Sequence, residues 1–191
     1  MADDLGAASL DVHARAREVL GFWFALTPEQ HFAKSPKLDA EIGARFGPLR
    51  DLVLGTCAAG WRDDPETLLA AIILLDQFSR NIHRGTAQAF AADPLALQLA
   101  LEAIEKGWDA GMSVEQRQFL YLPLEHAEDM AMQKLSIEKF ASLDDDYLLG
   151  FAQKHAQVVE RFGRFPSRNA ALGRESVAEE LEFLKEEGAG W

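Results

Sequence analysis

The sequence predicts an all-α fold, and two observations lead to this prediction. Apolar residues recur at helical spacing along almost the whole chain, whereas the alternating pattern of a strand is hard to find. In addition, Pro28, Pro36, Pro65 and Pro94 each follow a residue that can cap a helix, and proline suits the first helical turn. Each of these pairs therefore marks an expected helix start.

Capping patterns supply further helix boundaries. Ser113 with Gln116 and Ser176 with Glu179 have the spacing of a capping box, and Gly163 follows an expected helix end, where a left-handed residue is common. We expect longer helices over residues 11–25, 36–56, 65–80, 94–106, 114–133, 144–162 and 176–187, and short turns over 28–33, 86–92 and 167–171.

Pro123 lies inside the expected helix over residues 114–133. Proline removes a backbone donor and clashes with the preceding turn, so we expect a kink or break there and a new helical start in LPLEHAEDM. Short connections favour antiparallel neighbours, which predicts a stack of helical hairpins. We expect residues 1–10 to be disordered and residues 11–191 to form a single domain.

Charge and composition exclude several classes of partner. The 191 residues carry a formal net charge of -12 at pH 7, which disfavours nucleic acid and anionic membranes. The longest apolar run, LLAAIILL, is far shorter than a membrane span, and the N-terminus lacks the pattern of a signal peptide. The single cysteine, Cys57, cannot form an intramolecular disulfide, and we expect an inert packed thiol in a cytoplasmic protein.

Polar residues crowd the segment LLDQFSRNIHRG, where an apolar helix ends. Asp76 and Arg80 are four residues apart, the spacing of an ion pair on one helix face. Alternatively, Arg80, Asn81, His83 and Arg84 project into a cleft and bind an anionic ligand through guanidinium and imidazole groups. The sequence leaves both interpretations open.

The segment YLPLEHAEDMAMQ offers candidates for acid–base chemistry. His126 can share a helix face with Asp129, and Glu125 is adjacent, so a carboxylate could orient the imidazole as a general base. The alternative is a solvated acidic face beside a core of Met and Leu residues. No second histidine stands at helical metal-ligand spacing, so we expect no metal site. Three further histidines stand alone in helical contexts, where we expect surface or cap positions: His13, His31 and His155.

Four arginines gather in RFGRFPSRNAALGRES, namely Arg161, Arg164, Arg168 and Arg174, with no acidic residue between the first and the last. They could pair with acidic side chains from other helices, namely Glu125, Glu128 or Asp76. None of the four is lysine, however, and arginine is favoured for planar, two-point and partly buried contacts. This choice indicates an organised polar site, with Arg164, Arg168 and Asn169 as candidate ligand-binding residues.

The chain also resembles a known family in these same stretches. The segments VLGFWFAL, LLDQFSRNIHRGTAQAFAADPLAL, QFLYLPLEHAEDMAMQ and RFGRFPSRNAALGRES together resemble the bacterial domain of unknown function 924, from about residue 19 to 184. The resemblance implies a TPR-like, all-α fold of stacked helical hairpins, and it implies no established activity, substrate or cofactor. Val177 stands where the family has Thr.

Three hypotheses for function follow. The first is a helical binding protein whose residues 80–84, 125–129 and 161–169 line a groove for an anionic small molecule or acidic peptide. The second is a small hydrolase or transferase with His126 as general base, oriented by a neighbouring carboxylate. The third is a structural or protein-interaction scaffold in which these polar residues lock helix ends. The sequence identifies no cofactor, ligand or oligomeric state.

Overall fold

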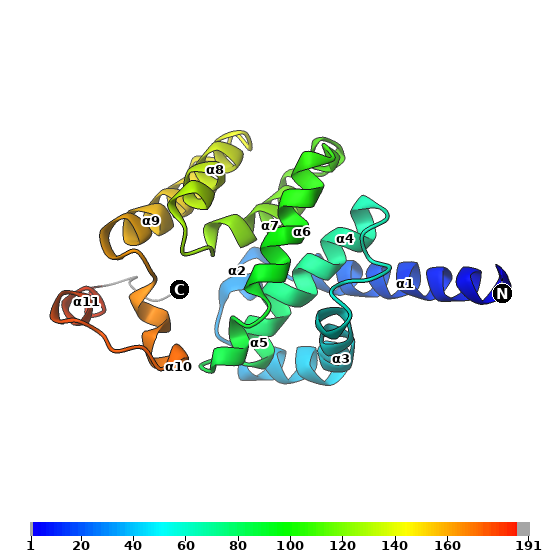
Figure 1. Ribbon diagram of the computed structural model, residues 1–191, viewed down its shortest axis with the longest axis horizontal. Helices are drawn as coiled ribbons and strands as arrows, with labels where there is room; N and C mark the ends of the chain where they lie inside the picture. Colours follow the sequence, from blue (N-terminus) through cyan, green and yellow to red (C-terminus); the bar gives the residue numbers. More distant parts are fainter. Residues whose placement is uncertain (1, 187–191) are drawn as a thin grey trace. The chain divides into compact units, whose positions relative to one another are not determined.

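The computed structural model describes residues 2–186, with the backbone alone for residues 2–10. Every regular element in this range is helical, which confirms the all-α fold (Figure 1). The chain separates into two compact units. The first unit comprises the residues up to Arg84 and Gln88–Pro123, and the second comprises Gly85–Ala87 and the residues from Leu124 onward. A single domain over 11–191 stays a prediction.

The first unit is built from long helices joined by short helical turns. Its elements are α1 (Ala2–Trp23), α2 (Pro28–Phe32), α3 (Pro36–Gly55), α4 (Pro65–Ile73), η1 (Leu74–Phe78), α5 (Ser79–Ile82), α6 (Asp93–Glu105), η3 (Trp108–Gly111) and most of α7 (Val114–Glu125). The turn η2 (Ala87–Ala89) and the end of α7 lie at the boundary with the second unit.

Capping chemistry sets most of these helix starts, as the sequence predicts. The side chains of Thr27, Ser35 and Asp64 each accept a backbone hydrogen bond at the start of a helix that has proline in its first turn. The fourth prediction is shifted by one residue, because α6 begins at Asp93 itself and Ala92 occupies the cap position without a side-chain bond. The carboxylate of Asp93 is thereby left for another partner.

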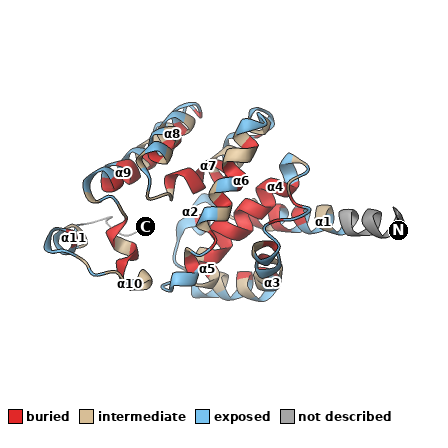
Figure 2. Ribbon diagram, viewed as in Figure 1, coloured by how far each residue is buried: buried red, intermediate tan, exposed pale blue. Residues whose placement is uncertain are grey.

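The core of the first unit surrounds α4, whose residues from Thr67 to Ile73 are all buried (Figure 2). A helix that is apolar on every side is stable only when it is enclosed, and the run LLAAIILL meets that condition. α1 packs on α4, and α3 packs on η1 and α5. Aromatic rings fill the spaces between them, with Phe78 5.0 Å from Phe46 and 5.5 Å from Trp23, measured between ring centroids.

The helix expected over residues 65–80 contains a wider, π-helical turn, η1, between α4 and α5. All five residues of η1 are buried, including Asp76 and Gln77. Such turns are rare and occur frequently at functional sites. The sequence pattern alone does not distinguish this turn from a regular α-helical one.

The second unit contains α8 (Met130–Ala141), α9 (Asp146–Phe162), η4 (Pro166–Arg168), α10 (Asn169–Leu172) and α11 (Ala178–Phe183). α8 and α9 pack side by side and are joined by a short connection (Figure 1). A small apolar core of Val158, Val159 and Phe165, with Phe162 and Phe183 beside it, fixes the reversal that follows α9.

Several boundaries differ from the sequence prediction. α7 continues through Pro123 to Glu125, and the break comes at residues 126–129, where Asp129 caps a new helix that runs on to Ala141. The cap, rather than the proline, therefore sets this boundary. The second predicted capping box also moves by one residue, because Glu180 instead of Glu179 accepts the hydrogen bond from the backbone N–H of Val177. α11 ends at Phe183, and residue 187 lies outside the described residues.

The chain start also differs from the prediction. The helical backbone of α1 begins at Ala2 instead of residue 11, so it includes most of the stretch for which the sequence predicts disorder. Disorder over residues 1–10 stays a prediction, because the side chains there lie outside the described part. None of the helices in the described range is long and apolar enough to cross a membrane.

Candidate functional site

The candidate residues from the sequence fall into two groups, one in each unit. The first unit holds Asp76, Arg80, Asn81, His83 and Arg84, and the second holds Glu125, His126, Asp129, Arg164, Arg168 and Asn169.

In the first unit, Arg80 binds two carboxylates. Its Nη1 lies 2.9 Å from Asp76 Oδ1, which confirms the predicted pair, and Nη1 and Nη2 donate to the two oxygens of Asp93 at 2.9 and 3.0 Å. Nη1 also donates to the backbone carbonyl of Asp76 at 2.9 Å, inside the wide turn η1. Burial works to lower the pKa of Arg80, but the charges of Asp76 and Asp93 outweigh it and raise that pKa. Arg80 is therefore held internally as a cation.

Asp39, in the first turn of α3, plays the same part for Asn81 and Arg84. Its Oδ1 accepts from Asn81 Nδ2 and Arg84 Nη2, each at 2.8 Å, and its Oδ2 accepts from Arg84 Nε at 2.8 Å. The hydrogen bonds from Arg84 are the main cause of the lowered pKa of Asp39. Sequence reasoning missed Asp39 and Asp93, since no local pattern links them to residues so far along the chain.

His83 is half-buried near Arg50. Burial, together with the positive charge of Arg50, lowers the pKa of His83 below its ordinary value, so this imidazole is neutral near pH 7. Arg50 is itself buried and donates to Ser79 Oγ and Asp51 Oδ1, each at 2.9 Å. His83 therefore adds no positive charge to this end of the unit at neutral pH.

In the second unit, the arginine cluster is paired with glutamates. Arg164 Nε and Nη2 donate to the two oxygens of Glu180 at 2.6 and 2.8 Å, and Arg174 makes the same two-point contact with Glu128 at 2.7 and 2.9 Å. The hydrogen bond from Arg164 is the main cause that lowers the pKa of Glu180 to about 2. These contacts are the planar ones for which arginine is favoured over lysine.

Arg168 and Asn169 are both buried. The guanidinium carbon of Arg168 lies 4.4 Å from the centroid of the Phe165 ring, and Asn169 Nδ2 donates to Ser176 Oγ at 3.0 Å and to Glu180 Oε2 at 3.2 Å. Burial works to raise the pKa of Glu128, but bonds from Arg174 and from the Phe165 backbone, with the charges of both arginines, lower it. Arg168 thus belongs to the same charged network.

Glu125, a candidate partner of His126, pairs with His155 in the structure, and the role of His126 stays a prediction. Glu125 Oε1 lies 2.9 Å from His155 Nδ1, and both side chains are buried. His126 is half-buried, with its ring centroid 6.2 Å from that of His155, and Asp129 Oδ1 accepts the α8 cap bonds. The prediction of a surface or cap position for His155 is wrong, because burial of a lone histidine depends on a partner that its own neighbours in sequence do not reveal.

Two other single-residue predictions need correction. His31 is buried, with Nε2 2.9 Å from the backbone oxygen of Trp23 and its ring 4.6 Å from the Trp23 ring. Cys57 is exposed rather than packed, because it lies in the turn after α3 with a φ of 51°. The apolar pattern around each residue predicts neither the burial of His31 nor the exposure of Cys57.

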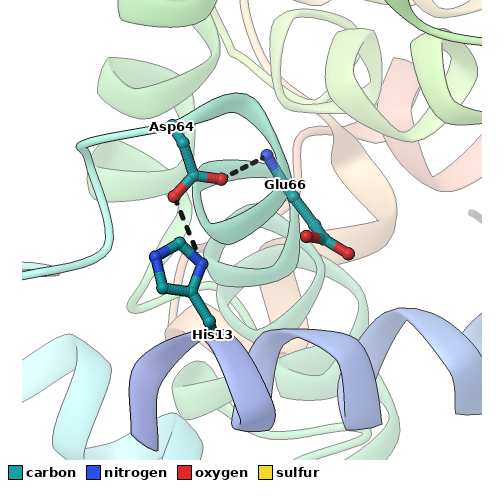
Figure 3. A group of neighbouring side chains, drawn as sticks. All are labelled: His13, Asp64 and Glu66. Atoms are coloured by element: carbon teal, nitrogen blue, oxygen red, sulfur yellow. Dashed lines mark hydrogen bonds and ion pairs between the residues drawn. The ribbon is translucent and has the colours of Figure 1, made fainter. Parts of the chain in front are cut away.

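His13, Asp64 and Glu66 form the one group in the described range whose side chains could hold a metal ion (Figure 3). Their ligand atoms lie within 4.8 Å of one another, with His13 Nδ1 3.6 Å from Asp64 Oδ2. Asp64, however, already caps α4 by accepting from the N–H groups of Glu66 and Thr67, and Thr67 Oγ1 donates to Oδ2 at 2.8 Å. The positive end of the helix dipole further disfavours a cation there. The absence of a metal site stays a prediction.

Comparison with known proteins supplies relatives without a known activity. A family model described as "Bacterial protein of unknown function (DUF924)" matches residues 19–188. The solved structure of a protein of unknown function, ATU0120 from Agrobacterium tumefaciens, is 40% identical, covers 91% of this chain and 98% of its own, and has a TM-score of 0.86. Among curated proteins, none matches.

Proposed function

Because the chain belongs to the DUF924 family, whose description names no activity, we propose from its own geometry that it is a helical protein-interaction scaffold. In this proposal the arginines are internal clamps that hold helices together. The observation that carries the proposal is the two-point pairing of four of them, Arg80, Arg84, Arg164 and Arg174, with carboxylates of their own unit.

The pairing disfavours the alternative of an anion-binding groove. A free anion would have to displace a carboxylate that the fold already holds in place, and an intramolecular partner acts at high effective concentration. The net charge of -12 also repels anions at a distance. The acidic pairing partners are therefore better explained as part of the structure than as stand-ins for a ligand.

The interaction role itself is supported by exposed apolar side chains on the second unit. Tyr147 on α9 is 73% exposed, and its ring packs edge-on against Phe151 at 5.0 Å between centroids. Tyrosine is enriched at protein interfaces. TPR-like stacks of helical hairpins also bind peptides and proteins, although this is an analogy at the level of the fold. We expect Tyr147 to lie on the interaction surface.

A thermal-shift experiment separates clamps from an anion site. Wild type, Arg84→Lys and Arg164→Lys are each melted with a panel of anionic metabolites and acidic peptides, at constant ionic strength. Clamps predict a lower Tm for both variants in buffer and no anion-specific rise in wild type. A rise in wild type that is lost in a folded Arg84→Lys or Arg164→Lys would support anion binding in place of the scaffold.

The surface role has its own test. A protein partner cross-linked to wild type in cells should be lost with Tyr147→Ser, which leaves the core untouched, and kept with Arg84→Lys, which weakens only a clamp. Equal loss in both variants, or no loss in either, would contradict the assignment of the surface to Tyr147.

Acid–base catalysis is a second candidate, favoured by the geometry of His155. Nδ1 lies 2.9 Å from both the backbone oxygen of Phe151 and Glu125 Oε1, and a carbonyl oxygen only accepts, so Nδ1 carries the proton. The ring atom left to accept a proton is then Nε2, and the two contacts of Nδ1 fix the orientation of the ring, as a general base requires. If a substrate is found, His155→Gln should abolish turnover at a temperature at which the variant is still folded, as shown by circular dichroism, whereas turnover retained by the folded variant would remove this candidate.

A further inference from the structure

The interior of the second unit holds four buried polar side chains where the end of α7 meets α8 and α9. Glu125 and His155 are 3% and 4% exposed, and Gln133 and Ser136 are fully buried. Nearly all buried polar groups in proteins have hydrogen-bond partners. The partners of these side chains can therefore be followed atom by atom.

Only part of this cluster is satisfied. Glu125 Oε1 faces His155 Nδ1 at 2.9 Å, and Gln133 Nε2 donates to the backbone oxygens of Glu125 and Ala127, each at 2.7 Å. Three buried atoms have no hydrogen-bond partner, namely Glu125 Oε2, Gln133 Oε1 and Ser136 Oγ. A buried carboxylate oxygen without a donor is costly, so this arrangement calls for a group that supplies donors.

The three unpartnered atoms belong to one small region. Gln133 and Ser136 are three residues apart in α8, so they lie on the same face of that helix. The amide of Gln133 donates to the backbone oxygen of Glu125 at 2.7 Å, so Gln133 lies beside the residue that carries the unpartnered carboxylate oxygen. The Glu125 and Gln133 oxygens can only accept hydrogen bonds. The Ser136 hydroxyl can rotate so that its oxygen accepts one as well, which makes three acceptors.

We propose that this region binds a small cation with several N–H donors, of the protonated primary amine class. The Glu125 carboxylate supplies the negative charge, and the Gln133 and Ser136 oxygens complete a set of three acceptors for the ammonium group. A calcium ion fits less well, since Ca²⁺ takes about six to eight oxygen ligands and this region offers three unpartnered oxygens. An anion fits less well than a cation, because two of the three oxygens accept hydrogen bonds only and the Ser136 hydroxyl supplies a single donor.

Salts matched in charge test the proposal on the full-length protein. Ammonium and methylammonium chloride are compared with potassium chloride, which has a similar ionic size and no N–H donors, and with tetramethylammonium chloride, at equal ionic strength. Tm and titration calorimetry are the readouts. At a hundred times Kd we expect a Tm rise of about 5–10 °C with the two donor salts. No rise is expected with the other two.

Variants locate the effect. Ser136→Ala removes one acceptor with little change in volume, and Glu125→Gln removes the charge, so both should lose most of the ammonium-dependent rise. Trp23→Phe, which removes the unpartnered buried Nε1 of the first unit, is the matched control and should keep the rise.

Three results would overturn the proposal. One is an equal response to ammonium and potassium, and another is an unchanged ammonium response in folded Ser136→Ala. The third is a crystal soaked in methylammonium chloride that holds only an ordered water beside Glu125 Oε2. If Glu125→Gln fails to fold, Ser136→Ala still decides the question.

Discussion

The two units use the same pairing of arginine with carboxylate, but they complete their polar networks to different degrees. In the first unit, Asp39, Asp76 and Asp93 hold Arg80, Asn81 and Arg84 through short hydrogen bonds, and the described part shows no unpartnered buried atom in this group. In the second unit the ion pairs are as short, yet unpartnered buried atoms remain on five side chains: Glu125, Gln133, Ser136, Asn169 and Arg174.

The difference teaches that short ion pairs alone do not mark a functional site. A network in which each donor meets an acceptor has few groups left to bind a ligand. The polar network of the first unit is therefore explained by its role in holding helices together. A network with unpaired acceptors keeps the capacity to bind. The four predictions below test this contrast, in order of decreasing effect.

The largest effect is expected at Asp76, which is fully buried in η1. Asp76→Ala leaves the half-buried Arg80 with one carboxylate instead of two, and removing the buried partner of an ion pair costs about 3–5 kcal/mol. The measurement is the free energy of unfolding in urea. Asp51→Ala is the control, since Asp51 is 67% exposed in its pair with Arg50 and should cost less than about 1 kcal/mol. Similar losses of unfolding free energy in both variants would mean that the buried pair of Asp76 with Arg80 stabilises the fold no more than an exposed surface pair does.

The second effect depends on pH and concerns Glu180 in the second unit. Arg164 lowers the pKa of Glu180 from 4.5 to about 2, so the stabilisation is fully present above pH 4.5 and is lost as the pH falls toward 2. Between pH 6 and pH 3, wild type should therefore lose more stability in urea than Glu180→Gln, which cannot ionise. Glu179→Gln, at an exposed neighbouring position, should keep the wild-type pH dependence, and a flat wild-type profile would contradict the clamp.

A moderate effect is expected at Asp129, which caps the helix that carries Gln133 and Ser136. Asp129→Ala should lower the free energy of unfolding by about 1 kcal/mol, because two backbone N–H groups lose their acceptor. Asp129→Ser should restore most of this loss, since serine also caps helices well. If serine does no better than alanine, the role of Asp129 is not capping.

The smallest effect is expected for Arg84→Lys. Arg84 is half-exposed, and lysine keeps its charge but loses the two-point contact with Asp39, so the cost should stay below about 1 kcal/mol. The pKa of Asp39, measured by NMR titration, should rise toward its ordinary value. An unchanged pKa of Asp39 would show that Arg84 does not hold this carboxylate in solution.

Features that depend on neighbouring residues could be predicted from the sequence. The all-α fold, the helix starts at Pro28, Pro36 and Pro65 and the pair of Asp76 with Arg80 all follow from spacings of a few residues. These interactions form within one turn of a helix, so the order of residues is sufficient to identify them.

Features that depend on distant residues could not be predicted. Asp39 pairs with Arg84 across 45 positions, and no pattern distinguishes it from the other acidic residues of this acidic chain. Glu128 pairs with Arg174 across 46 positions, and the sequence offers it as one of three candidate partners of the arginines without deciding among them. His155 stood alone in the sequence because its partner, Glu125, lies on another helix. The packing of the helices decides which carboxylate lies beside which arginine or histidine. A local sequence pattern carries no information on that packing.

The wide turn η1 sets the direction of three side chains that donate hydrogen bonds to carboxylates of their own unit. A π-helical turn holds about one residue more than an α-helical turn, and an α-helix advances about 100° per residue, so closing Leu74–Phe78 into a regular helix with all its residues kept would rotate everything that follows by about that angle. Arg80, Asn81 and Arg84 would then face away from Asp93 and Asp39 without any change in their own identity. Homologues that lack one residue here should therefore have a regular α-helix and keep the same partners at those positions, and an alignment that places the gap elsewhere would conceal the match.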